Sequence, residues 1–182
     1  MIPKKPNRNH PHFEDKKKGE AYYMKKIEKL ANGKLELFKV FLNLEKFISD
    51  ELNGSKLKLV IQGYLTANDL KRLYMPFKMV KNHDFLTAVE KQIVNKPKVN
   101  QDCPNMGFTV PVLGPKLELY EKTIDLKTIW DTPKTPNYVL TTNWCNFVKE
   151  NESIFKEGAE ILVCSFRMEG KLCFAVTSMG SY

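Results

Sequence analysis

The side chains that could hold a metal ion or carry out nucleophilic chemistry are few in this sequence. Zinc sites usually contain pairs of Cys or His two to four residues apart, and no two cysteines here have that spacing. His10 and His12 are close together, but a proline separates them and no third ligand is near. Reduced thiols of an intracellular protein are the simpler interpretation, and no cofactor is expected. The four cysteines are Cys103, Cys145, Cys164 and Cys173.

Catalytic groups are equally sparse. His83 is the single histidine outside the N-terminal segment, and no Ser or Cys has a general base at a known spacing. No glycine-rich phosphate loop occurs. The acidic residues Asp125 and Asp131 are interpreted as surface charges. The sequence therefore predicts a protein that is not an enzyme.

The charge of the chain indicates an anionic partner such as nucleic acid. The net charge is +8, but it is unevenly distributed. Residues 1–58 hold 14 Lys and Arg against 8 Asp and Glu, whereas residues 59–182 hold 15 against 13. No run of eighteen apolar residues occurs, so no membrane span is expected. The first residues are basic and rich in proline, which is unlike a secretory signal.

Residues 1–20 are predicted to form a disordered basic tail. The segment has three prolines and many charges, so it cannot bury enough apolar surface to offset its ordering entropy. Two basic clusters lie ten residues apart in it, and this layout is typical of a bipartite nuclear import signal, although solvated basic tails are common. The clusters are Lys4-Lys5 and Lys16-Lys17-Lys18.

After residue 20 the spacing of apolar residues changes once, from a helical pattern to short strand-like runs. Residues 21–54 are predicted to form a helical extension, because apolar residues recur every three or four positions before Asn53-Gly54 supplies a stop. From residue 55 to residue 182 short apolar runs alternate with turns, which indicates strands with two short helical pieces, near residues 82–94 and after Thr142. The predicted strands are 57–64, 108–112, 117–120, 123–129, 137–140, 161–166 and 172–177, the last two joined by a tight turn at Gly170.

Two blocks of sequence are specific enough to indicate a family. They are YLTANDLKRLYMP at residues 64–76 and YVLTTNWCNFVKE at residues 138–150, the second followed by Lys156-Glu157-Gly158. Together they resemble the plant B-three domain, the DNA-binding module of auxin response factors and related regulators. That family shows a Thr-x-Ser-Asp turn, then Arg-Leu-x-Ile-Pro, and later Tyr-Val-Leu-Thr-x-x-Trp-x-x-Phe-Val-Lys. The segment 75–94 resembles a divergent branch of these plant proteins.

The resemblance implies a mainly β fold and a function. The fold would be a seven-stranded open β-barrel, or DNA-binding pseudobarrel, with two short helices. Two of its loops, residues 66–72 and 130–137, would enter the DNA major groove like the jaws of a wrench. The chain would be a plant nuclear, sequence-specific transcriptional regulator, and its partner would be double-stranded DNA. Side chains of the types that bind bases and phosphates in the two loops are Asn68, Lys71, Arg72, Thr132, Lys134, Thr135 and Asn137.

Both loops depart from the family pattern. The family keeps five residues between the turn Asp and the Arg of Arg-Leu, whereas two residues separate Asp69 from Arg72. At roughly 3.3 Å per residue, the shorter first arm would lose several ångströms of reach. The second arm is two residues longer than usual and contains Pro133 and Pro136.

Two alternatives stay open on the sequence alone. Arg72 is either a DNA contact or a structural cation that ties the shortened arm to Asp69. The chain is either a DNA-binding regulator or an interaction module that keeps the barrel, has lost DNA binding and works through a protein partner or self-association at its N-terminal helix. Trp144, in contrast, is predicted to fill the core.

Overall fold

The computed structural model describes residues 12–95, 107–132 and 135–179 of the 182-residue chain. The chain divides into two compact units, residues 1–39 and residues 40–182. The first helix, α1 (His12–Asp50), contributes to both. It begins nine residues earlier than predicted, because residues 12–20 are helical and not part of a disordered tail. The last proline of the region is Pro11, and most residues after it favour helix, Glu and Lys in particular.

The turn after α1 lies at Asn53-Gly54, as predicted. Asn53 has a φ of +50°, the left-handed conformation that commonly ends helices. The N–H of Gly54 donates to the carbonyl oxygen of Ile48 at 2.8 Å. A Cβ on Gly54 would lie 2.6 Å from Cγ2 of Ile48 and 3.1 Å from the carbonyl oxygen of Arg167. Only glycine therefore lets the chain turn back this closely against the sheet.

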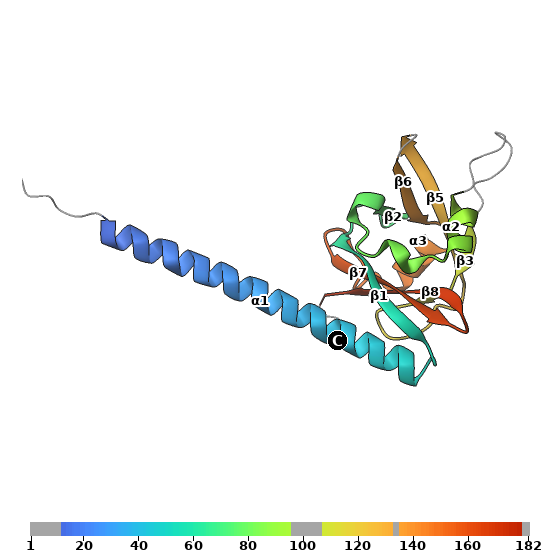
Figure 1. Ribbon diagram of the computed structural model, residues 1–182, viewed down its shortest axis with the longest axis horizontal. Helices are drawn as coiled ribbons and strands as arrows, with labels where there is room; N and C mark the ends of the chain where they lie inside the picture. The colour runs from blue at the N-terminus through green and yellow to red at the C-terminus, as the bar shows by residue number, and fades with distance from the viewer. Residues whose placement is uncertain (1–11, 96–106, 133–134, 180–182) are drawn as a thin grey trace, which may run out of the picture. The chain divides into compact units, whose positions relative to one another are not determined.

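Eight strands form two four-stranded sheets in the described part of the chain (Figure 1). The first sheet has the order β1-β7-β8-β4, formed by β1 (Ser55–Tyr64), β7 (Glu160–Met168), β8 (Lys171–Ser178) and β4 (Val112–Leu113). The second has the order β2-β6-β5-β3, formed by β2 (Leu73–Pro76), β6 (Thr135–Leu140), β5 (Ile124–Thr132) and β3 (Phe108–Val110). Neighbouring strands are antiparallel except for β4 and β8, which are parallel.

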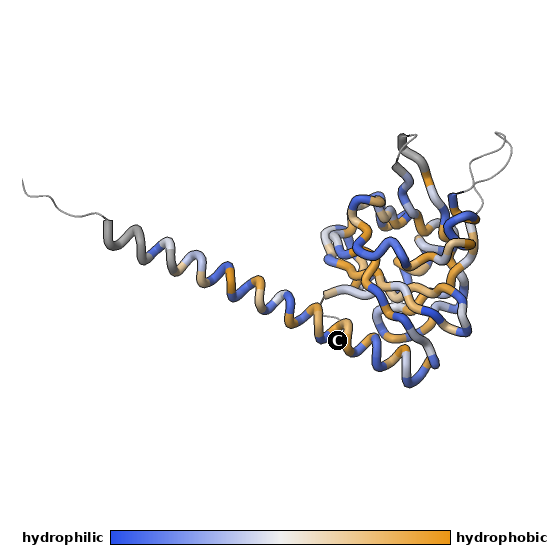
Figure 2. Tube along the Cα trace, viewed as in Figure 1, coloured by the Kyte–Doolittle hydropathy of each residue, from blue (hydrophilic) through white to orange (hydrophobic). Residues whose placement is uncertain are grey.

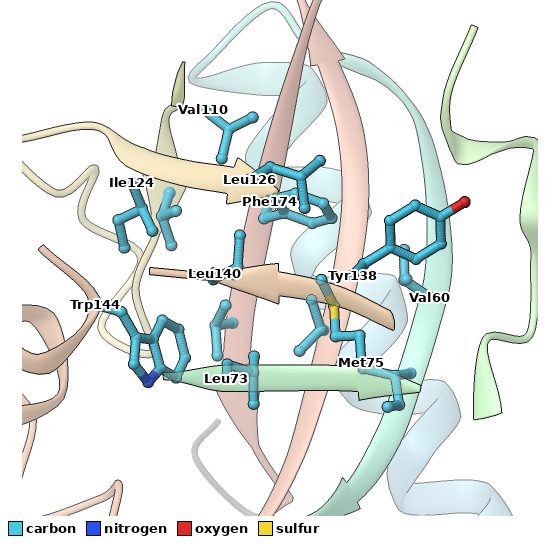
Figure 3. Close-up of a cluster of buried hydrophobic side chains, with 14 of the residues drawn as sticks. Val60, Leu73, Met75, Val110, Ile124, Leu126, Tyr138, Leu140, Trp144 and Phe174 are labelled. Atoms are coloured by element: carbon cyan, nitrogen blue, oxygen red, sulfur yellow. The ribbon is translucent and has the colours of Figure 1, made fainter. Parts of the chain in front are cut away.

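The core lies between these sheets. Successive side chains of a strand point to opposite faces, so every second residue can face the other sheet. In Figure 3 the side chains of Val60 and Phe174, from the first sheet, lie beside those of the second sheet, and Trp144 lies at one end of the cluster. In Figure 2 hydrophobic stretches are frequent in the second unit and also recur along α1. The prediction that Trp144 fills the core is confirmed, since it is fully buried.

The outer face of the first sheet is buried as well. Leu162, Cys164 and Phe166 alternate along β7 with residues of the core and are at most 1% exposed. Their partners across the strand pair are Thr177, Ala175 and Cys173 of β8, which are equally buried. Buried residues of α1 recur one helical turn apart outside the main cluster and belong to the same compact unit as the sheet, from which we infer that they cover this face. They are Val40, Leu44 and Ile48.

Short helices connect the strands. The predicted helical piece at residues 82–94 is a 3-10 turn, η2 (His83–Phe85), followed by α2 (Ala88–Val94), and a further 3-10 turn is η1 (Phe77–Met79). Thr87 and Glu90 begin α2 with a reciprocal capping box. The second predicted piece is α3 (Trp144–Glu150). Its N-cap is Asn143 at a φ of +66°, and the hydroxyl of the preceding Thr142 donates to the carboxylate of Asp125 at 2.6 Å.

The mainly β class is as predicted, and three strands differ. The predicted strand 108–112 is interrupted at Pro111 and forms β3 and β4, which belong to different sheets. Residues 117–120 form no strand, because Leu117 has a φ of +60° and Leu119 makes only an isolated bridge to Leu113. Conversely, β2 was not among the predicted strands, since its four residues follow a turn directly and end at Pro76. The turn between β7 and β8 is a two-residue hairpin with Glu169 and Gly170 at positive φ, as predicted. The described strands form two sheets, so the seven-stranded open barrel stays a prediction.

Candidate nucleic-acid interface

The first arm connects β1 to β2 and presents three of the predicted site residues. Asn68, Lys71 and Arg72 are all exposed. The arm is wound as one tight turn, because the N–H groups of Lys71 and Arg72 donate to the carbonyl oxygen of Asn68 at 3.0 and 3.1 Å. The N–H of Leu70 donates to the carbonyl oxygen of Thr66 at 3.3 Å. The structure therefore brings the three residues together on one compact projection.

Asp69 holds this turn in shape. One oxygen of its carboxylate accepts from the N–H of Thr66 at 3.0 Å and from the Thr66 hydroxyl at 2.6 Å. The other oxygen accepts from the N–H of Tyr74 at 3.3 Å, at the start of β2. A carboxylate that accepts several hydrogen bonds fixes the backbone on both sides of it. Asp69 thus stabilises the turn through its side chain, as Asp residues commonly do in turns.

A hydrogen bond from the buried Trp144 also holds the first arm in place. Its indole N–H donates to the backbone carbonyl oxygen of Asp69 at 2.6 Å. This bond was missed from the sequence, although a signal existed: a buried Trp needs an acceptor for its N–H. Trp144 therefore fills the core and positions the first arm at once.

Arg72 does not tie the arm to Asp69. Among the residues that the structure describes, Arg72 makes no ion pair, and the carboxylate of Asp69 is occupied by Thr66 and Tyr74. Lys71 likewise has no acidic partner within the described ranges. Both cationic groups are therefore available to an external anion.

An open groove runs beside the first arm. It encloses about 860 Å³. Its apolar part includes Ile61, Leu65 and Leu73, and the polar side chains of the arm lie along it. Tyr64 and Met79, which sequence reasoning did not single out, also line it with 67% and 46% of their surface exposed. The groove therefore combines cations, an amide and accessible apolar groups.

The second arm is a β-hairpin and not an eight-residue loop. β5 continues to Thr132 and β6 begins at Thr135, so that these two residues pair with each other. Pro136 lies within β6 and pairs with Trp130. The strand tolerates this proline because β2 pairs with β6 only from Asn137 onward, which leaves one side of position 136 without a neighbouring strand.

The remaining predicted contacts are only partly placed. Lys134 lies outside the described residues, and for Thr132 and Thr135 the backbone alone is described. Asn137 is half-buried and lies opposite Pro76 of β2, one of the residues that line the groove. The second arm thus begins beside the far end of β2 from the first arm.

The two predicted import clusters fall in different places. Lys4 and Lys5 lie outside the described residues. Lys16, Lys17 and Lys18 lie in the first two turns of α1, and Lys18 is exposed. An import signal is read as an extended chain, so the second cluster would have to unwind to serve as one.

The other chemistry of the described residues is limited. No three His, Cys, Asp or Glu side chains there come together as a metal site would require. None of the described helices has both the length and the apolar character of a membrane span. Burial raises the pKa of Cys164 to about 12 and raises the pKa of Cys173, so both stay protonated thiols at neutral pH.

These features define a mainly β domain with an exposed, cation-bearing turn beside an open groove. The family described as B3 domain-containing protein At2g31720-like matches residues 41–180. That range covers most of the chain and nearly coincides with the second unit, residues 40–182. The chain therefore belongs to the B3 domain family, a family of plant DNA-binding domains, as the resemblance of its sequence predicts.

Several proteins of Arabidopsis thaliana are similar to this chain. The putative B3 domain-containing protein At2g27410 is 35% identical over 138 residues, which are 72% of this chain and 51% of that protein. The B3 domain-containing protein At2g32645 is 35% identical over 133 residues, 69% of this chain and 67% of that protein. The match thus spans about half of the first relative and two thirds of the second. A solved structure titled Arabidopsis FUS3-DNA complex aligns at 16% identity with a TM-score of 0.41, over 69% of this chain and all of that one, a likeness too weak to carry an argument.

Proposed function

We propose that this chain is a sequence-specific DNA-binding transcriptional regulator of the plant nucleus. The observation that carries the proposal is the first arm. It presents Asn68, Lys71 and Arg72 to solvent on a turn whose backbone Asp69 and Trp144 hold in place. Arg and Lys bind guanine edges and phosphates, and Asn binds adenine. Preorganised side chains of these types are suited to reading a groove of DNA, because little ordering entropy is lost on binding.

The spacing of the two arms supports a major-groove contact. The first arm ends at Leu73 and the second begins beside Pro76, so they leave opposite ends of β2. The three residue steps between these positions span about 10 Å. The major groove of B-DNA is about 12 Å wide. Two arms at this separation could each contact one side of the same major groove. This is the arrangement expected of the open barrel that we propose for this chain. Thr132, Lys134, Thr135 and Asn137 are the proposed contacts of the second arm.

The charge of the second unit predicts how binding responds to salt. Residues 40–182 carry 18 Lys and Arg against 16 Asp and Glu, so few phosphates can be neutralised. The logarithm of the affinity should fall by about 0.9 per contacted phosphate for each logarithmic unit of salt. Binding through Lys71, Arg72 and Lys134 should give a shallow slope of about three. A steep slope would mean that the basic first unit, and not the arms, provides the DNA contact.

A selection from random oligonucleotides with the full chain tests the proposal directly. We expect one enriched motif, and its duplex then serves as the probe for variants. Lys116→Ala is the matched control for Lys71→Ala, since Lys116 is an exposed lysine that lines a different pocket. Lys71→Ala should weaken binding to the motif and Lys116→Ala should leave it unchanged. No preference among sequences at low salt would exclude a sequence-specific regulator.

Nuclear import through the two basic clusters is part of the same proposal. In a fluorescent fusion too large to diffuse through nuclear pores, replacing Lys4, Lys5, Lys16, Lys17 and Lys18 by Ala should leave the protein in the cytoplasm. The control replaces Lys25, Lys26 and Lys29, which are exposed on the next turns of α1, and should keep the fusion nuclear. Nuclear accumulation of the first variant would place the signal elsewhere.

A protein-interaction function is the second candidate, and one observation favours it. Large apolar side chains of α1 are exposed in the first unit, at residues where a monomer would expose polar groups. This surface does not exclude DNA binding by the second unit.

A further inference from the structure

α1 carries an exposed apolar stripe in the first unit. Its members recur at intervals of three, four, four and three residues, so they lie on one face of the helix. Each of the large members exposes 52–66% of its surface. Helices in proteins owe most of their stability to packing of such a face, and here the face has no cover in the described residues. The stripe consists of Met24, Ile27, Ala31, Leu35 and Phe38.

The spacing of this stripe is symmetric about Ala31. Ile27 and Leu35 lie four residues before and after Ala31, and Met24 and Phe38 lie seven residues before and after it. A surface of this kind is complementary to itself when two copies run in opposite directions. A twofold contact requires just this property, since the same patch must fit on both subunits. The small side chain at the centre lets the two helices approach closely.

We propose that α1 joins two copies of this chain as an antiparallel helix pair centred on Ala31. Phe38 of each copy then packs on Met24 of the other, a pairing of aromatic ring and thioether that is favourable. Ile27 packs on Leu35. With the neighbouring Tyr23 and Leu30, which are also exposed, six large side chains are available. At about 100 Å² each they would remove roughly 600 Å² per copy from water, at the lower end of the range for specific interfaces.

A parallel pair is disfavoured for two reasons. The seam of α1 with heptad spacing, Tyr23-Ile27-Leu30-Lys34-Leu37, has a lysine in its middle, and its continuation at Leu44 and Ile48 is already buried in the second unit. A parallel pair would also set the basic residues 16–18 and 25–26 of both copies level with each other. The antiparallel pair instead sets Lys26 level with Glu36 of the partner subunit.

Sedimentation equilibrium of the full chain tests whether it dimerises. We expect twice the chain mass of 21.1 kDa at concentrations of about 10 μM and above. Phe38→Glu should weaken the dimer on the order of tenfold or more, because it places a charge in the stripe. Tyr22→Glu is the matched control: Tyr22 is 64% exposed and Phe38 63%, but Tyr22 lies outside the stripe. A monomer at all concentrations, or a dimer that Phe38→Glu leaves intact, would overturn the proposal.

Disulfide trapping tests the direction of the helices. In a chain with Cys103→Ser and Cys145→Ser, Ala31→Cys should oxidise to a linked dimer. Phe38→Cys should not, because the two positions 38 would lie about 21 Å apart along the antiparallel pair. Both variants would link in a parallel pair, and that result would contradict the antiparallel arrangement. Neither sedimentation nor disulfide trapping depends on DNA binding, so these experiments test the interface independently of the proposed function.

Discussion

At the scale of single residues, the first arm contains two kinds of side chain: those that hold the turn in shape and those that remain free to bind a ligand. The carboxylate of Asp69 is filled by the N–H of Thr66, the hydroxyl of Thr66 and the N–H of Tyr74. Arg72 lies three residues further on and remains exposed, with no acidic partner in the described part of the chain. The sequence leaves two hypotheses for Arg72, a DNA contact or a structural cation that ties the arm to Asp69. In the structure Arg72 does not bind Asp69 and is not the tether.

Arg72→Ala should consequently affect binding and not stability. We expect it to weaken binding to the selected duplex by about 1–3 kcal/mol, the value of a bidentate base contact, while the melting temperature stays near that of the wild type. Asp69→Ala should lower the melting temperature, since it leaves the exposed N–H of Thr66 and the partly buried N–H of Tyr74 without their acceptor. Fluorescence anisotropy and thermal unfolding measure both quantities. A large loss of stability in Arg72→Ala would restore the tether hypothesis.

Trp144 should couple the core to the arm. Trp144→Phe keeps most of the apolar volume but removes the donor to the carbonyl oxygen of Asp69, and loss of a buried hydrogen bond costs about 1–3 kcal/mol. We expect lower stability together with weaker DNA binding at temperatures where the variant is folded. Phe147→Leu, on the same helix and in the same core, should lower stability alone. Wild-type affinity in Trp144→Phe would mean that the bond does not position the arm.

At the scale of elements, one ion pair fastens α2 to the first sheet. Arg167 of β7 donates to both carboxylate oxygens of Glu90 at 2.6 and 2.8 Å, and also to the carbonyl oxygen of Phe85 at 2.8 Å. The two side chains are only 14% and 18% exposed. Burial raises the pKa of Glu90, but the bonds from Arg167 and Thr87 outweigh it and leave that pKa below its ordinary value of 4.5. Since the folded state holds the ionised form, the pair stabilises the protein above about pH 4.5 and is lost as the pH falls through the lowered pKa.

Glu90→Gln should therefore reduce stability by about 1.5–3 kcal/mol at pH 7, the range for hydrogen bonds to charged groups. The difference from the wild type should begin to shrink below pH 4.5, where the carboxyl of the unfolded chain becomes protonated, and it should vanish once the pH falls below the lowered pKa of the native Glu90 carboxyl. Asp84→Asn is the control: Asp84 pairs with Lys58, but its side chain is 69% exposed, so water screens the pair and its loss should change stability little. Urea unfolding at pH 7 and pH 3.5 makes the comparison. A difference independent of pH would show that the charge of Glu90 is not what stabilises α2.

The elements also show why parts of the fold were predictable and others were not. The β7–β8 hairpin was found because Gly170 and two alternating apolar runs are local signals. β2 was missed because four residues carry almost no periodicity, and its partner β6 lies more than sixty residues away. Residues 117–120 have the composition of a strand but begin with Leu117 in the left-handed conformation, which composition does not reveal. In the site, Asp69 was predictable from turn chemistry, whereas Tyr64 and Met79 were not, since only the folded chain brings them to one groove.

At the scale of the whole molecule, the boundary of the folded domain differs from the one that the sequence predicts. The predicted domain begins at residue 55, after the helical extension. The second unit begins at residue 40, and the family match at residue 41. The reason is the outer face of the first sheet: Leu162, Cys164 and Phe166 are buried there although they do not belong to the main core. The last turns of α1 belong to the second unit, and we propose that they are part of the folded domain.

A protein shortened to residues 40–182 should accordingly unfold cooperatively with the same urea midpoint as the second unit of the whole chain, and a protein shortened to residues 55–182 should not. The second version lacks Val40, Leu44 and Ile48, each of which contributes about 1.5–3 kcal/mol by burial. Its sheet would expose Cys164 and Cys173, which burial otherwise protects. A thiol reagent under native conditions should therefore modify these two cysteines rapidly in residues 55–182 and slowly in residues 40–182. Equal stability and equal thiol protection of the two shortened proteins would show that the outer face of the first sheet needs no cover from α1.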